Sequence, residues 1–455
     1  MTHRPANEYP VNDTVFALST PVGGAIAVIR ASGALCLPVL KRIFTGGVEE
    51  RKLSSGSLCF DGETVDECMA VFFKGPRSYT GEDMFEIDLH GSYAVVKRVI
   101  DNLPRLGLRP AEPGEFTKRA FLNGKLDLVQ ADAVMDLINA ETDRSASAAL
   151  DQLRGGLSRR IADAERVLID LLGELSAAMD YPDEMEDETL SSVPETLSGV
   201  IAQFDELIKN GRASHLLRDG AKAVILGLPN AGKSSLMNAL LGADRAIVTD
   251  IAGTTRDTLE EKLNILGLSV RLVDTAGIRQ SAESPVERIG IARALDQAGS
   301  AQTVLFVLDG TKPAPSDEEL ALIGDVREES TVFVINKCDL APETCLEYKH
   351  ALKARFPNGE CVVISAKTGA GLEVLKQAVA KRLGASDVNP LITNTRHIAL
   401  IERARDELAA ATLETDCSLA STVIASALSA LSEITGREFS EELLDNIFSR
   451  FCVGK

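Results

Sequence analysis

The amino-acid sequence predicts a multidomain protein: an N-terminal α+β domain, a discontinuous all-α helical domain, and an α/β domain inserted between the two helical parts. Three patterns carry this prediction, namely short apolar runs broken by turn residues, a leucine stripe at helical spacing, and a regular alternation of strand, loop and helix. A length of 455 residues suits about three domains of ordinary size. We expect four segments, with the borders 1–125, 126–221, 222–385 and 386–455.

The first segment, 1–125, alternates apolar runs with Gly, Pro and Asp, as strands and turns do. Its apolar runs include AIAVIR (25–30), AVFF (70–73) and MFEIDLH (84–90). The later stretch EPGEFTKRAF is typical of a helix start. This mixture predicts a small α+β domain.

From about residue 126 the apolar residues recur every three or four positions. The stripe consists of Leu150, Leu153, Leu157, Ile161, Ala164, Leu168, Leu171 and Leu175. It predicts long packed helices, in spite of Gly155 and Gly156. After the turn-rich SDVNPLIT, the stretches HIALIERARDELAAA and STVIASALSALSEIT return to helical spacing. The simplest assembly packs these last helices against 126–221, which makes 222–385 an insertion.

The inserted segment contains five apolar runs that each end in a loop of polar or small residues. They are AVILG, RLVDTAG, TVLFVLDG, TVFVINK and CVVIS. Alternation of this kind predicts a mostly parallel sheet, with ligands bound at the carboxyl ends of the strands.

The first of these loops, GLPNAGKS (227–234), fits the pattern GxxxxGK[ST] between a strand and a helix. Its glycines let backbone amides wrap phosphates, Lys233 reaches the terminal phosphates, and the Ser234 hydroxyl is a ligand for Mg²⁺. The predicted nucleotide-binding residues here are Asn230, Ala231, Gly232, Lys233, Ser234 and Ser235.

Three further loops resemble the G motifs of GTPases: DTAG (274–277), NKCD (336–339) and SAK (365–367). Asp274 is assigned to the magnesium shell and the Gly277 amide to the γ-phosphate. Asp339 matches the aspartate that pairs with the guanine amino group and ring N–H, so GTP is favoured over ATP. The predicted contacts are Asp274, Thr275, Ala276, Gly277, Asn336, Lys337, Asp339, Ser365, Ala366 and Lys367.

A switch-like loop, TDIAGTTRD, lies between the first two motifs. Its Thr255 resembles the second magnesium-ligating hydroxyl, and the loop adds Thr249, Asp250, Ile251, Ala252, Gly253, Thr254 and Thr255 to the predicted GTP contacts. Position 278 is Ile, where Ras-like proteins carry the glutamine that orients water. Another residue must therefore position the nucleophile, and Glu283 and Glu287 are the candidates because a carboxylate can orient water.

Composition narrows the class of protein. With 45% hydrophobic and 25% charged residues, and neither a signal peptide nor about 18 consecutive apolar residues, we expect a cytoplasmic protein without a membrane segment. The eight cysteines have no zinc spacing, so neither disulfides nor structural zinc is expected. The net charge is −19, which is the opposite of the usual nucleic-acid footprint. Any RNA contact is expected to be local or weak.

With these motifs in view, the chain resembles the bacterial tRNA-modification GTPase family MnmE, also called TrmE, along nearly its whole length. The segments that carry the resemblance are TPVGGAIAVIRASG, RSYTGEDMFEIDLHG, EPGEFTKRAFLNGKLDLVQADAVMDLINA, the G motifs, VERIGIARA and the terminal FCVGK. The resemblance implies a folate-binding, dimerising N-terminal domain, a discontinuous helical domain and an inserted G domain. One departure is the loop TPVGG, which is one residue shorter than the family's TPPGxG and lacks its basic residue.

What the resemblance implies about function is specific. With an FAD-dependent partner, MnmG (GidA), in a heterotetramer or larger complex, a homodimer of the chain would add an aminomethyl or carboxymethylaminomethyl group to C5 of the wobble uridine of certain tRNAs. A 5-formyl- or methylene-tetrahydrofolate would be bound. Position by position, the folate contacts are Arg30, Glu86, Lys125 and Lys455. A carboxylate such as Glu86 suits the donors of a pterin ring, and Arg or Lys suits folate's glutamate tail.

The resemblance also assigns residues to catalysis and to K⁺. Glu287 matches the residue that orients water, and the K⁺ ligands are Asn230, Thr249, Ile251 and Thr254. A monovalent cation can stabilise the developing phosphoryl charge where other systems use an arginine finger, once two G domains meet face to face. Cys452 matches a terminal cysteine proposed to be functional, although a lone cysteine is equally a buried hydrophobe.

Two other classes of GTPase are weighed against this interpretation. A ribosome-assembly or RNA-binding GTPase would add a basic module, whereas 386–455 carries 6 basic and 11 acidic residues. A dynamin-like membrane GTPase would need a basic or apolar membrane tip, and the segment 126–221 is acidic. Neither class explains FCVGK or the LNGKLD block.

Overall fold

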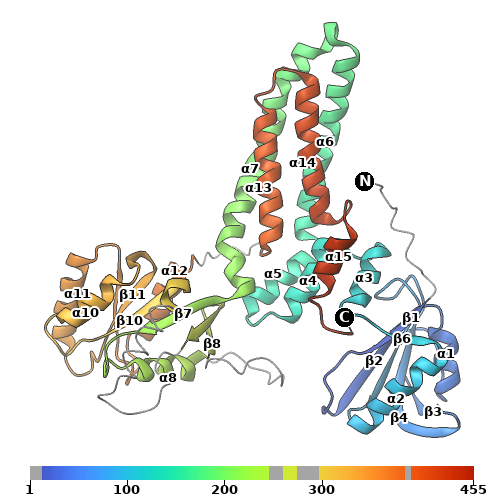
Figure 1. Cartoon of the computed structure of the whole chain (residues 1–455), viewed down its shortest axis with the longest axis horizontal. Helices are drawn as coiled ribbons and strands as arrows, with labels where there is room; N and C mark the ends of the chain where they lie inside the picture. Colours follow the sequence, from blue (N-terminus) through green and yellow to red (C-terminus); the bar gives the residue numbers. More distant parts are fainter. Residues whose placement is uncertain (1–12, 245–259, 274–296, 385–390, 455) are drawn as a thin grey trace. The chain divides into compact units, whose positions relative to one another are not determined.

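A computed structural model describes residues 13–244, 260–273, 297–384 and 391–454 (Figure 1). The chain falls into two compact units. The first contains residues 1–135, 153–163 and 428–455, and the second contains 136–152 and 164–427. Each unit is described by itself.

The first unit is built on a six-stranded sheet in the order β3-β4-β5-β2-β1-β6. Neighbouring strands are antiparallel except β1 and β6, which are parallel. Its strands are β1 (Thr14–Leu18), β2 (Ile26–Ser32), β3 (Ser54–Phe60), β4 (Glu63–Phe73), β5 (Met84–His90) and β6 (Leu108–Pro110). Its short helices are α1 (Cys36–Ile43), α2 (Tyr93–Asn102), η1 (Leu103–Leu106), α3 (Glu115–Leu122) and α15 (Glu441–Phe448).

The two faces of this sheet differ in how they are covered. On one face α1 and α2 contact the strands and enclose the largest core of the unit, which includes Ile29, Phe85 and Ile87. The opposite face packs against α3 only in part, through a small cluster around Phe116. Further along that face Ile26 and Met69 are exposed, so much of it is open.

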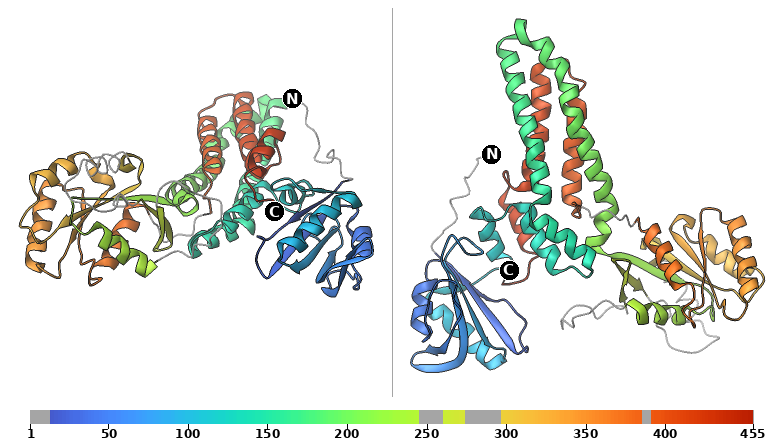
Figure 2. Two further views of the ribbon diagram at one scale, coloured as in Figure 1. Left: turned by 60° about the horizontal axis from the view of Figure 1, so that its bottom comes forward. Right: turned by 180° about the vertical axis from the view of Figure 1, so that it is seen from behind.

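Long helices make up the helical domain, and Figures 1 and 2 show α6, α7, α13 and α14 running side by side. The bounds are α4 (Leu128–Ile138), α5 (Asp143–Leu153), α6 (Gly156–Asp180), α7 (Pro182–Asp219), α13 (Thr395–Ala411) and α14 (Cys417–Thr435). The leucine stripe therefore forms two helices, because Gly155, with φ 79°, separates α5 from α6. The stretch STVIASALSALSEIT, predicted to be helical, lies in α14, and by length and hydropathy alone α14 could cross a membrane. Core helices of bundles pass the same test, and Ile424 and Leu431 of α14 are buried.

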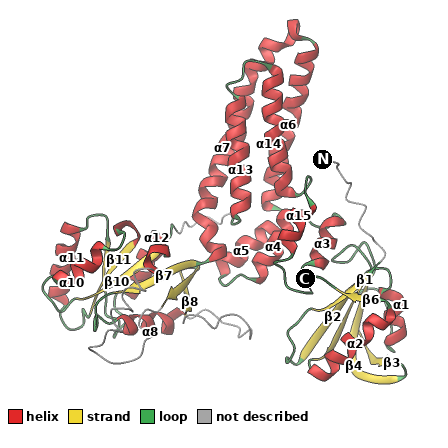
Figure 3. Ribbon diagram, in the orientation of Figure 1, coloured by secondary structure: helices red, strands yellow, loops and turns green. Residues whose placement is uncertain are grey.

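In the second unit, a six-stranded sheet has the order β12-β11-β10-β7-β9-β8 and is parallel except for the β8–β9 hairpin (Figure 3). Helices α8 and α12 bury one face and α10 and α11 the other. Its strands are β7 (Ala221–Leu226), β8 (Glu260–Ile265), β9 (Leu268–Val273), β10 (Thr303–Asp309), β11 (Thr331–Asn336) and β12 (Glu360–Val363). Its helices are α8 (Lys233–Asp244), α10 (Asp317–Gly324), η2 (Glu328–Ser330), α11 (Pro342–Arg355) and α12 (Leu372–Arg382).

The loop between α4 and α5 docks on the β8–β9 hairpin of the same unit. Glu141 accepts hydrogen bonds from Lys262 Nζ and, at 2.5 Å, from Ser269 Oγ. Thr142 Oγ1 donates to the carbonyl of Gly267 at 2.9 Å. This polar contact joins the helical part of the unit to the α/β part.

The predicted fold class is confirmed: an α+β N-terminal domain, a helical domain made of separated segments, and an inserted α/β domain. The border at 125 lies between α3 and α4, the border at 221 lies at the first residue of β7, and the border at 385 falls outside the described residues. The division into these four segments stays a prediction. All eight cysteines lie in described segments and are free thiols.

Candidate functional site

The loop predicted to bind phosphates connects β7 to α8. Gly227 has φ 141° and Gly232 has φ 100°, a region that favours glycine. A Cβ at Gly227 would lie 2.2 Å from the carbonyl oxygen of Val307, and one at Gly232 would lie 2.2 Å from Asn336 Nδ2. Backbone conformation and space therefore both require glycine at these two positions.

Lys233 begins α8 and points back into this loop. Its Nζ donates to the carbonyls of Gly227 at 2.8 Å and Leu228 at 2.9 Å. The next residues, Ser234 and Ser235, are exposed in the first turn of the helix. The ammonium group and the predicted magnesium hydroxyl thus lie at the helix N-terminus, where anions bind favourably.

Asn336, at the end of β11, connects three of the predicted motifs. Its Nδ2 donates to the carbonyl of Ala231 at 3.0 Å, and its Oδ1 accepts from the amides of Lys337 at 2.8 Å and Ala366 at 3.0 Å. Because Asn336 is only 3% exposed, these bonds form without competition from water. The sequence assigned Asn336 to the nucleotide, and the structure gives it this second, bracing role.

The predicted base-recognition residues lie around that amide. Ser365 Oγ donates to Asp339 Oδ1 at 2.7 Å, which orients the carboxylate assigned to guanine. Lys337 has φ 71°, and its Nζ pairs with Asp309 Oδ2 at 2.7 Å. Burial acts to raise the pKa of Asp309, but the hydrogen bonds from Lys337 and Thr311 outweigh it and lower that pKa. Lys367 is exposed beside this group.

Several predicted residues lie outside the described part of the chain. These are Thr249, Asp250, Ile251, Ala252, Gly253, Thr254, Thr255, Asp274, Thr275, Ala276, Gly277, Glu283, Glu287 and Lys455. Their roles stay predictions.

A second cluster lies on the partly open face of the N-terminal sheet, around Arg30 of β2. Arg30 is opposite Glu86 of β5, and its Nε and Nη2 bond Glu86 Oε1 at 2.7 and 2.6 Å. The guanidinium carbon lies 5.8 Å from the ring centroids of Tyr79 and of Phe116, which is within cation–π range. The sequence singled out Arg30 and Glu86, and the structure brings them together with two rings that it did not single out.

The C-terminal motif FCVGK reaches the same place. The carbonyl oxygen of Gly454 accepts bonds from Arg30 Nη1 and from Ser19 Oγ, both at 3.3 Å. Gly454 has φ 96°, and a Cβ there would lie 2.7 Å from the carbonyl oxygen of Leu18. A residue near the end of the chain is therefore fitted closely against strand β1.

Just before it, Cys452 has an exposed side chain while its carbonyl accepts the Gly114 amide at 3.4 Å. The alternative that Cys452 is a buried hydrophobe is therefore wrong. The thiol is accessible, and its backbone is held near the Arg30 cluster by the packing of Phe451 and Gly454 on either side.

Lys125 is connected to the cluster through the loop that carries Tyr79. Its Nζ donates to the carbonyl of Pro76 at 3.1 Å, and the neighbouring Asn123 Nδ2 donates to the carbonyl of Thr80 at 2.7 Å. Tyr79 in turn shares a 2.9 Å hydrogen bond with Thr117 of α3. Lys125 thus borders the loop rather than contacting Arg30 or Glu86 in the described structure.

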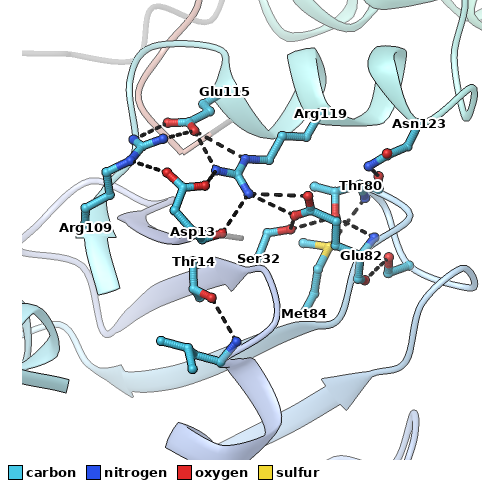
Figure 4. A network of polar contacts seen from close by, with 12 residues as sticks. Asp13, Thr14, Ser32, Thr80, Glu82, Met84, Arg109, Glu115, Arg119 and Asn123 are labelled. Atoms are coloured by element: carbon cyan, nitrogen blue, oxygen red, sulfur yellow. Dashed lines mark hydrogen bonds and ion pairs between the residues drawn. The ribbon is translucent and has the colours of Figure 1, made fainter. Parts of the chain in front are cut away.

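Behind this loop lies a charged network that the sequence analysis missed (Figure 4). Arg119 of α3 pairs with Glu115 at 2.8 Å, with Asp13 at 2.7 Å and with Glu82 at 3.1 Å. Arg109 makes two bonds to the same Glu115, at 2.9 and 2.6 Å. The signal in the sequence was the spacing of Glu115 and Arg119, four residues apart on a predicted helix. The network fixes α3 to the sheet and to the Tyr79 loop.

Comparison with known proteins shows which family the chain belongs to. Residues 14–125 match a family described as "GTP-binding protein TrmE N-terminus", and residues 128–452 match one described as "MnmE helical domain". The chain is 42% identical over 453 residues to the tRNA modification GTPase MnmE of Thermotoga petrophila, which covers 97% of this chain and 100% of the relative. The chain belongs to the MnmE family of tRNA modification GTPases. It is 41% identical over 458 residues to the MnmE of Aquifex aeolicus, with 98% of this chain and 100% of the relative covered.

Among solved structures, the GTPase Era of Aquifex aeolicus covers 41% of this chain and 66% of its own, at 28% identity and a TM-score of 0.30. The family assignment rests on the sequence matches and not on that superposition. As an MnmE-family protein the chain is a GTPase, and the loop cluster around Lys233 and Asn336 is its candidate GTP site.

Proposed function

We propose that this chain uses GTP hydrolysis to drive the addition of an aminomethyl or carboxymethylaminomethyl group to C5 of the wobble uridine of certain tRNAs. In this proposal it works as a cytoplasmic homodimer with the FAD-dependent partner MnmG. The observation that carries the proposal is the convergence of Arg30, Glu86 and the C-terminal Gly454 on one sheet face. A GTPase domain alone would not need this second site.

The second site fits a tetrahydrofolate in its chemistry. Arg30 and Lys125 supply cations for a glutamate tail, and the carboxylates of the open face supply acceptors for the N–H groups of a pterin. Tyr79 and Phe116 add flat apolar surface beside Arg30. The bound folate would supply the one-carbon unit, while the chain's own residues bind and orient it. Lys455 would add a further cation, and Cys452 an accessible thiol.

The homodimer is supported by the same open face. Ile26 is 61% exposed and Met69 41% exposed on strands that the unit's own helices leave uncovered. Exposed apolar residues grouped on a sheet face are typical of an interface. The acidic net charge of −19 supports a division of labour in which MnmG supplies much of the contact with tRNA phosphates.

For hydrolysis, the proposal assigns Mg²⁺ to Ser234, Thr255 and Asp274, and K⁺ to Asn230, Thr249, Ile251 and Thr254. Asn230 has φ 63° and is exposed at the tip of the phosphate loop, where a cation could lie against the γ-phosphate. Glu287, rather than Glu283, would orient the attacking water.

Replacing Na⁺ by K⁺ at equal ionic strength tests the K⁺ assignment. Because a cation against the transferred phosphoryl group stabilises its developing charge, we expect GTP turnover to rise more than about tenfold in K⁺. An Asn230→Ala variant should lose most of this difference. Equal turnover in the two salts would contradict the assignment.

Mass spectrometry of tRNA nucleosides tests the whole proposal. Cells lacking this chain should lose the C5-substituted wobble uridine, and the intact gene should restore it. A gene with Lys455 deleted and a gene with Arg30→Ala should not restore this nucleoside. The control is Arg42→Ala, which removes an exposed arginine from α1 on the other face of the sheet, and this gene should restore the nucleoside fully. An unchanged nucleoside profile in the deletion strain would contradict the proposed role in tRNA modification, and the chain would be a GTPase that serves another process.

A further inference from the structure

One hairpin of the second unit connects the switch-like loop to DTAG, the two segments assigned to Mg²⁺ and the γ-phosphate. Strand β8 begins at Glu260, shortly after the switch-like loop, and β9 ends at Val273, directly before DTAG. Glu260 and Val273 are opposite each other in the register of the hairpin. Both predicted switch segments are therefore attached to the same end of one hairpin, so a movement of the hairpin displaces both points of attachment together.

The other end of this hairpin is a turn that needs support. Its two central residues, Leu266 and Gly267, have φ 50° and 83°, as in a type I′ turn. A leucine rarely adopts a positive φ, and such a conformation persists only where surrounding contacts hold it. Strand β8 is also an edge of its sheet, so among the described strands only β9 pairs with it. The position of the turn therefore depends on what packs against it.

The α4–α5 loop of the helical domain provides this support. The Thr142 hydroxyl donates to the Gly267 carbonyl at 2.9 Å, and Arg144 Nη1 donates to the Leu266 carbonyl at 3.5 Å. A Cβ at Gly267 would lie 2.3 Å from Arg144 Cδ, so the arginine side chain lies directly on the turn. Thr142 is 6% exposed, and its hydroxyl also accepts from the Ser145 amide at 3.1 Å, which fixes it at the start of α5. Side chains of one loop thus hold both carbonyls of the turn.

We propose that Thr142 is a positioning residue for GTP hydrolysis. It holds the hairpin turn against the helical domain, and through the hairpin it places the switch-like loop and DTAG for catalysis. In the sheet order, β8 and β9 lie on one side of β7, whereas β11 and β12, which lead into NKCD and SAK, lie on the other. Loss of the contact should therefore slow turnover and hardly change nucleotide affinity. The inference rests on the proposed function, because it depends on the roles assigned there to Thr255 and Asp274.

The test measures GTP turnover and GDP binding by the purified full-length protein in Mg²⁺ and K⁺. Thr142→Val has nearly the same shape but lacks the hydroxyl, so turnover at saturating GTP should fall at least about fivefold. Its GDP affinity in titration calorimetry should stay within about twofold of the unaltered protein, because the loss concerns the reaction and not binding. Thr142→Ser keeps the hydroxyl, so its turnover should lie within about twofold of the unaltered protein.

Ser145→Ala is the matched control for damage to α5. Ser145 Oγ accepts from the Thr142 amide at 3.2 Å and donates to the Thr142 carbonyl at 2.9 Å. Its loss weakens the same helix start but leaves the bond from Thr142 to Gly267 in place. Thermal melting reports the loss of stability in each variant, and turnover of Ser145→Ala should stay within about twofold of the unaltered protein.

Asp274→Asn separates this inference from the proposed function. It removes the charge assigned to the magnesium shell, so turnover should fall at least about 100-fold. If Asp274→Asn hydrolyses GTP normally, the roles proposed for the two switch segments fail, and the inference fails with them. If Asp274→Asn is inactive but Thr142→Val keeps normal turnover, or loses GDP affinity as much as turnover, only the inference about Thr142 is wrong. An equal loss of turnover in Ser145→Ala would also overturn it, because damage to α5 would then account for the effect.

Discussion

The two six-stranded sheets of this protein place their sites in different ways. The parallel sheet is covered by helices on both faces, so its site is built from loops at the carboxyl ends of β7, β11 and β12. The N-terminal sheet is mostly antiparallel and is covered by α1 and α2 on one face only. Its site therefore lies on the other face, and is built from side chains in the middle of strands.

This difference determines which kind of change disables each site. A loop site depends on backbone conformation and on close approach of loops, so added bulk should disrupt it. A face site depends on side chains and on the helix that partly covers them, so removal of charge should disrupt it. Substitutions chosen for these two mechanisms can test the contrast.

Gly232→Ala should have the strongest effect, because its Cβ would meet the Nδ2 of Asn336, which is buried and bonded to three loops. We expect GTP turnover to fall at least about 100-fold, since small displacements of catalytic groups have effects of that size. Binding of 5-formyltetrahydrofolate should not change. Gly242→Ala is the control, because a Cβ on that glycine of α8 meets nothing within 4 Å. Normal turnover of Gly232→Ala would show that the loops do not brace one another as described.

The contrast also explains how much the sequence predicted. The phosphate loop and NKCD are short continuous motifs whose chemistry is local, so Lys233, Asn336 and Asp339 could be assigned from residues alone. The N-terminal site joins Arg30, Tyr79 and Gly454, which are far apart in the chain. Only a family resemblance could connect such residues, because no local pattern specifies which strands become neighbours.

Other features were beyond both kinds of reasoning. Arg119 is one charged residue on an amphipathic helix, and nothing in the sequence shows that Asp13 and Glu82 meet it. The leucine stripe is interrupted at Gly155 and Gly156, which could have indicated a helix end. The three- and four-residue spacing of the apolar residues continues across these glycines, however, and for that reason the sequence did not predict a break. Docking of the α4–α5 loop on the β8–β9 hairpin depends on tertiary packing, and the spacing of apolar residues along the sequence does not predict such contacts.

Glu115→Gln should break the network that holds α3 over the N-terminal site. Glu115 is 7% exposed, and its loss of charge leaves Arg109 and Arg119 with fewer partners, so we expect the N-terminal domain to lose about 3 kcal/mol of unfolding free energy. GTP turnover should stay normal. Glu112→Gln, an equal charge change at an exposed position, is the control and should cost less than about 0.5 kcal/mol.

The pH dependence of that effect follows from the pKa of Glu115. Burial acts to raise it, but hydrogen bonds from Arg109, the Glu112 amide and Arg119 outweigh burial and lower the pKa below 4.5. A lowered pKa means that the charged form stabilises the fold above that value and that this stability is lost as the pH falls through the folded-state pKa. In urea unfolding, the difference in unfolding free energy between the unaltered protein and Glu115→Gln should therefore be constant at neutral pH. It should become smaller below pH 4.5. A difference that persisted unchanged in acid would rule out the charge as its cause.

Glu141→Gln should give the smallest effect, because it alters a partly exposed contact where helical and α/β parts of the second unit meet. Gln can still accept the hydrogen bond from Ser269, but the attraction to Lys262 is lost, and partly exposed pairs contribute less than about 1 kcal/mol. Binding of GDP raises the melting temperature of the part of the protein that holds it, which identifies the melting transition of the α/β part, and we expect a small fall in the midpoint of that transition. A double-mutant cycle with Lys262→Met should give a coupling free energy that is also less than about 1 kcal/mol. Additive effects of the two substitutions would show that the charge contributes nothing there. In that case the uncharged hydrogen bond from the Thr142 hydroxyl to the Gly267 carbonyl would hold the hairpin, and the α/β site would depend on side-chain charge even less than the contrast between the two sheets implies.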